Sequence, residues 1–174
     1  LLAGLSFWGI KTLWTSESAI AGGQKEKSVS ATSVAATVPA RGGEVWVKVV
    51  KSSHTLYLYE GDRIIMTSTV AVGENPGDKQ RAGDRRTPEG EFVVEQIQNS
   101  SYWKYDFGDG PVEGAYGPWF IRLKTGWQGI GIHGTHDESF LGKDVTEGCV
   151  RMKNEDLEFL KSCISVGTRV VIEP

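Results

Sequence analysis

The feature that most constrains the fold is a period of two in the apolar residues of two early segments. Val45, Val47 and Val49 alternate with other residues, and residues 55–59 alternate leucine with tyrosine. Successive side chains of a strand point to opposite faces, so this pattern predicts two β-strands that each bury one face. The Glu-Gly-Asp sequence and the β-branched run that follow, at 60–72, predict that the second strand continues into a hairpin.

The remainder of the chain also favours short strands. Further strands are expected at 91–95, 119–124, 129–133 and 169–172, with a long polar loop at 73–88. One short amphipathic helix is expected to begin with Asn154 as its N-cap and to end before Gly167. The 22 glycines exceed average usage, which fits tight turns better than a helical bundle. We therefore predict a mainly β, sandwich-like domain with one or two short helices.

The first 43 residues differ in composition from the rest. Residues 1–14 are almost wholly apolar, and Ala19-Ile20-Ala21 has the small-x-small pattern of a signal cleavage site. Residues 1–21 are therefore predicted to be the remnant of a signal peptide or, alternatively, a membrane anchor. Residues 22–43 are rich in Ser, Thr, Ala and Gly and predict a flexible linker before a folded domain at 44–174. We expect an exported protein of the periplasm or cell envelope.

A second irregular stretch, 99–118, is too aromatic for a solvated linker. It places Tyr102, Trp103, Tyr105 and Tyr116 among glycines. Such a segment is either a lid over a binding site or a loop held to the core by its aromatic rings, and the sequence leaves both open.

The balance of charge argues against nucleic acid as a partner. The formal net charge is −3, with 19 basic and 22 acidic residues. Proteins that bind nucleic acid through its phosphates present a basic surface, and this composition predicts none.

The chain has two cysteines, Cys149 and Cys163. Their spacing lacks the pattern of ordinary zinc ligands, so we predict no metal site. A disulfide between them is one possibility in an exported protein. Alternatively, Cys163 is a small buried thiol of the predicted helix, and Cys149, which follows a glycine in a loop, is a nucleophile.

A nucleophilic cysteine needs a base or a cation nearby, because a free thiol with a pKa of about 8.5 is mostly protonated at neutral pH. Arg151 supplies a positive charge close to Cys149. His133 is the best candidate for the base, because it follows a β-like apolar run and lies at the rigid end of a strand. A buried structural histidine is the alternative for His133. His54 and His136 are expected at the surface.

Several segments together resemble the L,D-transpeptidase catalytic domain. They are Ile-His-Gly-Thr at 132–135, Leu-Gly at 141–142 and Thr-Glu-Gly-Cys-Val-Arg-Met at 146–152. Upstream and downstream, 87–92 is similar to a Thr-Pro-x-Gly-x-Phe element and 166–170 to a closing strand of that family. The resemblance covers about 44–174 and implies an L,D-transpeptidase-like β-sandwich.

The resemblance implies a role for each residue of the site. Cys149 would be the nucleophile and His133 its base, with the Gly134 carbonyl orienting the imidazole. The backbone amides of Gly148 and Cys149 would form the oxyanion hole. The candidates for contacts with substrate are Arg151, Thr146, Tyr116 and Trp119.

Two details of this assignment remain open. The family often has a second histidine where this chain has Glu147, so His133 must act alone. Arg151 would bind a substrate carboxylate, but an ion pair with Glu155 or Asp156 is an alternative.

The resemblance also implies what the enzyme acts on. The donor would be the tetrapeptide stem of peptidoglycan, cut before its terminal D-alanine, with a thioester intermediate and no cofactor. Acylation by carbapenems would follow from the same chemistry. The competing hypotheses are an L,D-carboxypeptidase with the same site, a catalytically silent wall-binding module and a cysteine peptidase of unrelated fold.

Overall fold

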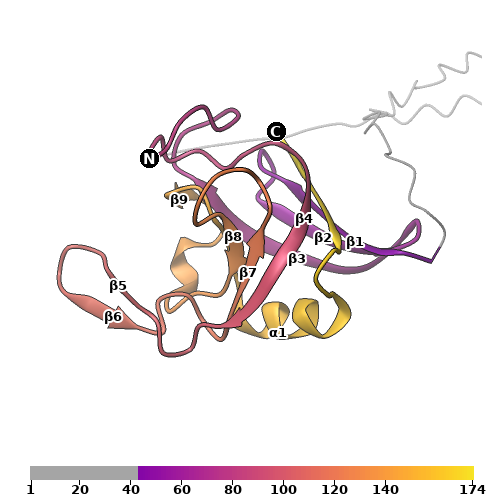
Figure 1. Ribbon diagram of the computed structural model, residues 1–174. Coiled ribbons are helices and arrows are strands. Elements are labelled where there is room, and N and C mark those ends of the chain that lie inside the picture. Colours follow the sequence, from indigo (N-terminus) through magenta and orange to yellow (C-terminus); the bar gives the residue numbers. More distant parts are fainter. Residues whose placement is uncertain (1–42) are drawn as a thin grey trace, which may run out of the picture. The chain divides into compact units, whose positions relative to one another are not determined.

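The computed structural model describes residues 43–174 (Figure 1). The predicted signal peptide or anchor, 1–21, and all but the last residue of the predicted linker lie outside the described residues. Within the described part of the chain, no helix is long and apolar enough to cross a membrane.

Nine strands form one strongly curved sheet in the order β10-β8-β7-β4-β11-β1-β2-β3-β9. Their bounds are β1 Val45–Val50, β2 Thr55–Glu60, β3 Arg63–Gly73, β4 Gly90–Asn99, β7 Trp119–Leu123, β8 Gly131–His133, β9 Asp144–Thr146, β10 Val150–Met152 and β11 Arg169–Glu173. Because β10 pairs with both β8 and β3, the sheet folds back on itself and its two layers face each other. The prediction of a mainly β, sandwich-like domain is confirmed.

The alternation in β1 and β2 sorts side chains between the two faces of the sheet. Val47 and Val49 are fully buried in the core, as the period of two predicts. Trp46 points to the other face, where its ring stacks on Tyr59 with 4.3 Å between ring centroids. The antiparallel pairing of β2 with β3 confirms the predicted hairpin.

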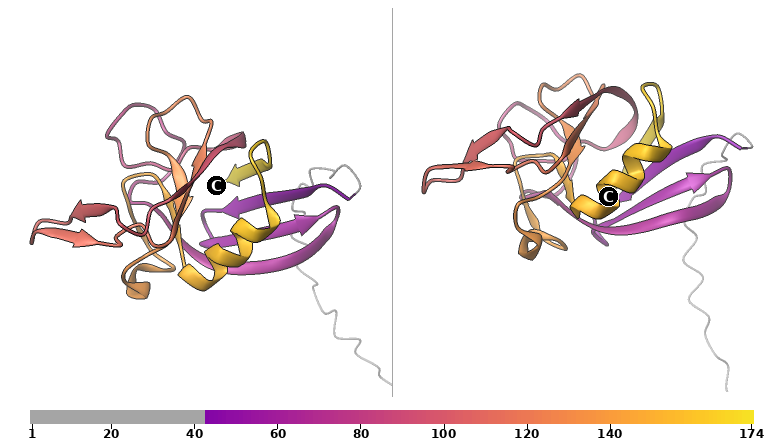
Figure 2. Two further views of the ribbon diagram at one scale, coloured as in Figure 1. Left: turned by 60° about the horizontal axis from the view of Figure 1, so that its bottom comes forward. Right: turned by 90° about the horizontal axis from the view of Figure 1, so that it is seen from below.

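The single α-helix of the described residues, α1, comprises Asn154–Cys163 and contacts β7 (Figure 2). Its Leu157 and Leu160 are fully buried against the sheet, because they lie on one face of the helix. The predicted N-cap is wrong by one residue: Lys153 occupies that position without a side-chain cap. Asn154 is the first helical residue, and its side chain accepts a hydrogen bond from the Thr135 N–H instead of capping the helix.

Four strands of three residues each were not predicted, because they are too short to show a period. Two of them, β9 and β10, bracket the loop that carries Cys149, so the cysteine is followed directly by a strand. The other two, β5 Lys104–Asp106 and β6 Pro111–Glu113, form a separate hairpin inside the aromatic stretch. Figures 1 and 2 show this hairpin projecting from the body of the domain.

Candidate active site

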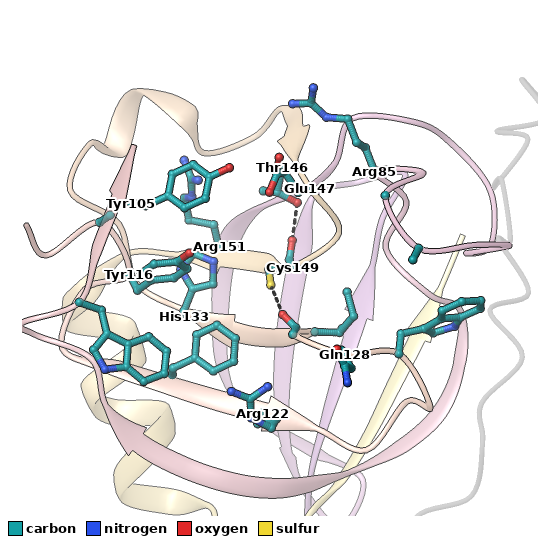
Figure 3. Close-up of a pocket in the computed structure, with 18 of the residues that line it drawn as sticks. Arg85, Tyr105, Tyr116, Arg122, Gln128, His133, Thr146, Glu147, Cys149 and Arg151 are labelled. Carbon is teal, nitrogen blue, oxygen red and sulfur yellow. Dashed lines mark hydrogen bonds between the residues drawn. The ribbon is translucent and has the colours of Figure 1, made fainter. Parts of the chain in front are cut away.

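One cavity of about 930 Å³ surrounds Cys149. Its wall combines the end of β8, the loop before β10, the aromatic stretch and the polar loop after β3 (Figure 3). Of the predicted site residues, Cys149, His133, Thr146, Tyr116 and Arg151 all line it. Residues far apart in the sequence are therefore brought together in one cavity.

The Cys149 side chain is partly exposed, and its thiol donates a hydrogen bond of 3.1 Å to the Gly129 carbonyl. Burial raises the pKa of this thiol to about 11, against the opposing effects of the Gly131 backbone and the Arg151 charge. The resting cysteine is therefore protonated. Cys163, near the end of α1, is also a free thiol, so the two cysteines form no disulfide in this structure.

His133 is 3% exposed and ends β8. Its Nδ1 lies 2.7 Å from the carbonyl oxygen of Gly134, so Nδ1 carries the proton and donates, which leaves Nε2 as an acceptor. Burial lowers the pKa of His133 to about 3, the Arg151 charge lowers it further, and the Gly134 hydrogen bond opposes both. The ring stacks on Phe120 at 5.6 Å and meets the edge of Tyr116 at 5.0 Å. A neutral imidazole in a fixed orientation results.

The register of two short strands brings the histidine close to the cysteine. β10 runs parallel to β8, and Arg151 is paired with His133 while Val150 is paired with Ile132. Cys149 directly precedes this ladder. The position of the nucleophile relative to the imidazole is therefore set by backbone hydrogen bonds rather than by flexible loops.

Asn154 packs against Gly134, the residue that follows His133. The sequence did not identify Asn154 as part of the site. Its Oδ1 accepts a hydrogen bond of 2.9 Å from the Thr135 N–H. A Cβ atom on Gly134 or on Gly117 would collide with that same oxygen. The two glycines and the asparagine thus form a closely packed unit that fixes the Gly134 carbonyl. The only sequence signal, an asparagine at a helix start, indicated a cap.

The loop before Cys149 is shaped by Gly148 and Thr146. Gly148 has φ of +126°, a conformation that favours glycine, and a Cβ there would lie 2.7 Å from the Arg86 carbonyl oxygen. Its N–H donates to Thr146 Oγ1 at 3.2 Å, and that hydroxyl donates to the Cys149 carbonyl at 2.6 Å. The Gly148 N–H, predicted as an oxyanion donor, and the Thr146 hydroxyl, predicted as a substrate contact, are therefore both hydrogen-bonded within the loop. Among residues 43–174, the Cys149 N–H donates no hydrogen bond.

Arg151 is a buried cation, only 8% exposed. Its guanidinium carbon lies 5.0 Å from the ring centroid of Phe140 and 5.8 Å from that of Phe107. Its Nε has no hydrogen-bond partner among the described residues. Burial lowers the pKa of Arg151, and nearby ionisable groups, led by Cys149, oppose this shift. The side chain is held by aromatic faces and keeps hydrogen-bonding capacity for a ligand.

The alternative role for Arg151, an ion pair with an acid of α1, is wrong. Glu155 pairs with Lys153 at 3.0 Å, and Asp156 accepts a hydrogen bond of 2.6 Å from Ser68. Both carboxylates are therefore engaged elsewhere.

Tyr116 contributes its ring to the cavity and ties the aromatic stretch to the core. It contacts the rings of Trp103 at 5.8 Å and Tyr105 at 6.1 Å, besides that of His133. These contacts favour the interpretation of this stretch as a loop held by its aromatic rings. The ring of Tyr102, at 67% exposure, lies outside this cluster.

Trp119 lies away from the cavity, which corrects its prediction as a substrate contact. Its Nε1 donates to Glu158 on α1 at 2.9 Å, and the Lys161 ammonium lies 4.4 Å from its ring centroid. The residue is not among those that line the cavity. Neighbouring side chains of a strand point to opposite faces, so only one of Trp119 and Phe120 can face the cavity. The sequence alone did not show that this residue is Phe120.

Glu147 lines the cavity and is exposed. Burial raises the pKa of the Tyr105 hydroxyl, and the nearby Glu147 carboxylate raises it further. Figure 3 shows Glu147 close to Cys149, between Tyr105 and Arg85. The acid therefore stands at the mouth of the site.

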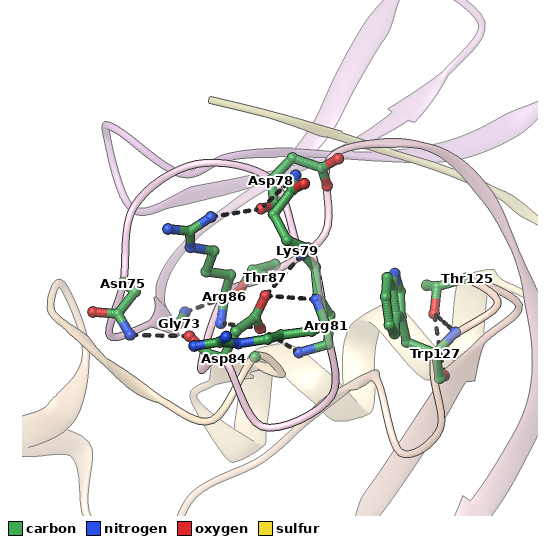
Figure 4. Close-up of polar contacts among 12 residues, drawn as sticks. Gly73, Asn75, Asp78, Lys79, Arg81, Asp84, Arg86, Thr87, Thr125 and Trp127 are labelled. Atoms are coloured by element: carbon green, nitrogen blue, oxygen red, sulfur yellow. Dashed lines mark hydrogen bonds and ion pairs between the residues drawn. The ribbon is translucent and has the colours of Figure 1, made fainter.

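A second part of the cavity wall, from the polar loop after β3, was not identified from the sequence. Lys79 is 7% exposed, donates to Asp84 at 2.7 Å and lies 5.7 Å from the Trp127 ring centroid (Figure 4). Burial opposes ionisation of Asp84, but hydrogen bonds from Lys79 and from three backbone N–H groups hold its pKa well below the usual range. The sequence indicated a loop here, and composition alone gives no sign of such internal pairing.

The other two histidines lie outside the core of the site. His136 is exposed, with its ring 4.8 Å from that of Phe107, as expected for a surface position. His54 is half-buried and pairs with Asp144 at 2.9 Å. Residues 43–174 hold no group of three or more His, Cys, Asp or Glu side chains placed to bind a metal ion.

Comparison with protein families gives a match to one family model. The model of the L,D-transpeptidase catalytic domain, YkuD, matches residues 44–172. Among curated proteins, the Putative L,D-transpeptidase YkuD of Bacillus licheniformis is 36% identical over 138 residues, which cover 79% of this chain and 68% of that protein.

Solved structures share the fold at low sequence identity. An L,D-transpeptidase from Mycobacterium smegmatis superposes with a TM-score of 0.57 at 16% identity, covering 75% of this chain and 59% of that one. The LD transpeptidase LdtMt1, solved in complex with imipenem, has a TM-score of 0.56 at 16% identity and coverage of 74% and 58%. The chain thus spans less than two thirds of either structure.

Proposed function

Because the chain belongs to the L,D-transpeptidase catalytic domain family, we propose that it is a cysteine acyltransferase acting on peptidoglycan stem peptides. The observation that carries this proposal is the pairing of Cys149 and His133 in one cavity, with His133 Nδ1 held 2.7 Å from the Gly134 carbonyl. This hydrogen bond leaves Nε2 free to accept the thiol proton. The backbone carbonyl takes the place of the carboxylate in a Ser-His-Asp triad.

The first half of the reaction forms a thioester. The Cys149 thiol gives its proton to Nε2 of His133 while its sulfur attacks the carbonyl carbon of the donor. The Cys149 N–H is the donor best placed to stabilise the negative oxygen, since the Gly148 N–H is bound to Thr146. When the tetrahedral intermediate collapses, the C–N bond breaks and the leaving amine takes the proton from His133.

The second half transfers the acyl group. An acceptor amine attacks the thioester carbonyl and loses a proton to His133, and the thiolate leaves and regains that proton as a thiol. With the pKa of His133 near 3 and that of Cys149 near 11, the resting pair is neutral. Proton transfer therefore accompanies attack on the carbonyl and does not precede it.

Arg151 is the candidate for recognition of the substrate carboxylate. It is buried two residues from Cys149 and is held by two aromatic rings, and no acid of residues 43–174 forms an ion pair with it. Cutting a tetrapeptide stem before its last residue releases an amino acid with a free carboxylate, which a planar guanidinium binds well. Tyr116 contributes an aromatic wall to the same pocket.

The substrate places the enzyme outside the cytoplasm. Export through the apolar segment at 1–21, either cleaved or retained as an anchor, is the proposed route, with 22–43 as a tether to the cell envelope. Acylation by a carbapenem is a further part of the proposal, supported by the imipenem complex of a protein with the same fold.

Incubation with a tetrapeptide stem tests the proposal. We expect released D-alanine together with cross-linked or exchanged peptides, detected by mass. Release of D-alanine without any amide product would instead indicate an L,D-carboxypeptidase with the same cysteine. No consumption of the stem by the intact protein would support a silent wall-binding module.

A further inference from the structure

Two opposite charges flank the proposed nucleophile in sequence, and neither forms an ion pair with the part of the chain that the structure describes. Glu147 lies two residues before Cys149, faces the cavity and forms no ion pair within residues 43–174. Arg151 lies two residues after Cys149, is more than nine-tenths buried and has an unpartnered Nε. Both residues line the cavity that holds Cys149 (Figure 3).

Of the other cations that line the cavity, Arg122 donates a hydrogen bond of 3.3 Å to Gln98 and lies 5.2 Å from the Phe120 ring centroid, and the remaining two are paired with acids. Arg85 pairs with Glu74 at 2.5 Å, and Lys79 pairs with Asp84 at 2.7 Å. Neither is free to cancel the charge of Glu147. A carboxylate that is kept exposed beside a reactive centre, with nearby cations bound elsewhere, is suited to pair with a cation that arrives from solvent.

We propose that Glu147 selects the acceptor by pairing with the ammonium group of an α-amino acid centre whose carboxylate is held by Arg151. This inference rests on the proposed acyl transfer and assigns Glu147 as the residue that recognises the acceptor at the same site. The acceptor is a centre that carries an amine and a carboxylate on one carbon, either as a free amino acid or as part of a side chain.

The chemistry of the two half-reactions supports this assignment. The leaving group of the first half is an amino acid, so its nitrogen and its carboxylate occupy a fixed place beside the thioester carbonyl. Once it leaves, the acceptor nitrogen must reach the same carbon. A centre with the same amine and carboxylate fits the vacated place, with Arg151 on the carboxylate and Glu147 on the ammonium. Water makes neither contact.

The proton balance is complete with the groups present. The bound ammonium releases one proton through Glu147 to solvent, and the neutral amine attacks the thioester. The C–N bond forms, the C–S bond breaks, and the second amine proton passes through His133 to the departing sulfur. The products are an amide, a free Cys149 thiol and one proton in solution.

The aromatic hairpin also lies beside Glu147. Burial and the nearby Glu147 carboxylate raise the pKa of the Tyr105 hydroxyl, and the Tyr105 ring packs against Tyr116. The same hairpin supplies Phe107 to the Arg151 guanidinium. One structural unit is therefore in the neighbourhood of both charges.

Partitioning of the thioester between amine and water tests the inference. The full chain and its Glu147→Gln and Glu95→Gln variants are each incubated with a tetrapeptide stem and a range of D-amino acid concentrations. The ratio of exchanged to hydrolysed stem is read by mass. Both products come from one thioester, so this ratio does not depend on the acylation rate. Glu95 is an exposed acid of β4 outside the cavity and matches the charge change.

We expect Glu147→Gln to lower the ratio about tenfold, through a higher acceptor KM, and Glu95→Gln to leave it unchanged. The amide of the same D-amino acid, which keeps the ammonium but lacks the carboxylate, should be a poorer acceptor for the unmodified enzyme. An unchanged ratio in Glu147→Gln, or an equal fall in both variants, would overturn the inference. If the unmodified enzyme neither consumes the stem nor forms a carbapenem adduct, the proposed function fails, and this inference with it.

Discussion

The hydroxyl of Thr146 donates a 2.6 Å hydrogen bond to the backbone carbonyl of Cys149. The same oxygen accepts the Gly148 N–H, so one buried side chain closes the turn that presents the sulfur. Thr146 is therefore a positioning residue, and the sequence prediction of a substrate contact is replaced by this role.

Thr146→Val keeps the shape of the side chain but leaves the Gly148 N–H and the Cys149 carbonyl without their partner. Each buried unsatisfied group costs about 1–3 kcal/mol, so we expect a lower Tm in thermal unfolding. We also expect carbapenem acylation to slow by about tenfold or more, because the loop no longer fixes the sulfur. Thr146→Ser retains the hydroxyl and should preserve both properties. Full acylation by the valine variant would contradict the positioning role.

Arg151→Gln removes the buried cation and keeps a planar polar end. The KM for the tetrapeptide donor should rise about tenfold, because a charged hydrogen bond to the substrate carboxylate is lost. Steady-state kinetics on the stem peptide measures this change. The Tm should change little, because Arg151 forms no ion pair within residues 43–174 and its removal therefore leaves no buried acid without a partner. Arg63→Gln, at an exposed arginine, is the matched control, and an equal KM in all three proteins would refute the assignment.

The pH dependence of thiol alkylation follows from the shifted pKa values. Burial raises the Cys149 pKa to about 11 and lowers that of His133 to about 3, so between these limits thiol and imidazole are both neutral. The reactive thiolate therefore increases with pH up to about 11. Iodoacetamide alkylation of Cys149, measured in a Cys163→Ala background, should accelerate steadily from neutral to alkaline pH. A plateau that begins near pH 6 would indicate a resting thiolate–imidazolium pair instead.

Trp119→Phe tests the reassignment of the tryptophan. The indole N–H bonds Glu158 and the ring lies under Lys161, both on α1, so the substitution should lower Tm modestly. The KM for the stem peptide and the rate of carbapenem acylation should match those of the unmodified enzyme. A raised KM with an unchanged Tm would restore Trp119 as a substrate contact.

The sequence predicted the fold best where apolar periods are long. The alternation around Val47 and Val49 and the turn after Tyr59 are local patterns, and the structure contains the strands and hairpin that they predict. Four of the strands of three residues, including the one that carries Arg151, escaped prediction because they exist only through pairing with distant partners, whereas the three-residue strand that ends at His133 lies within a predicted segment.

The candidate site was predictable where residue chemistry alone is informative. Cys149, His133 and Arg151 were identified as a group because a cysteine nucleophile needs a base and a positive charge. The roles of Asn154 and Thr146 could not be predicted, since they depend on which backbone groups their side chains reach in the folded chain.

The most direct test of the central claim, that Cys149 is the nucleophile, is the intact mass of the protein after incubation with a carbapenem. We predict that the unmodified chain and Cys163→Ala each gain the mass of one carbapenem, whereas Cys149→Ala gains none. Addition of the carbapenem to Cys149→Ala, or loss of the adduct in Cys163→Ala alone, would contradict the account.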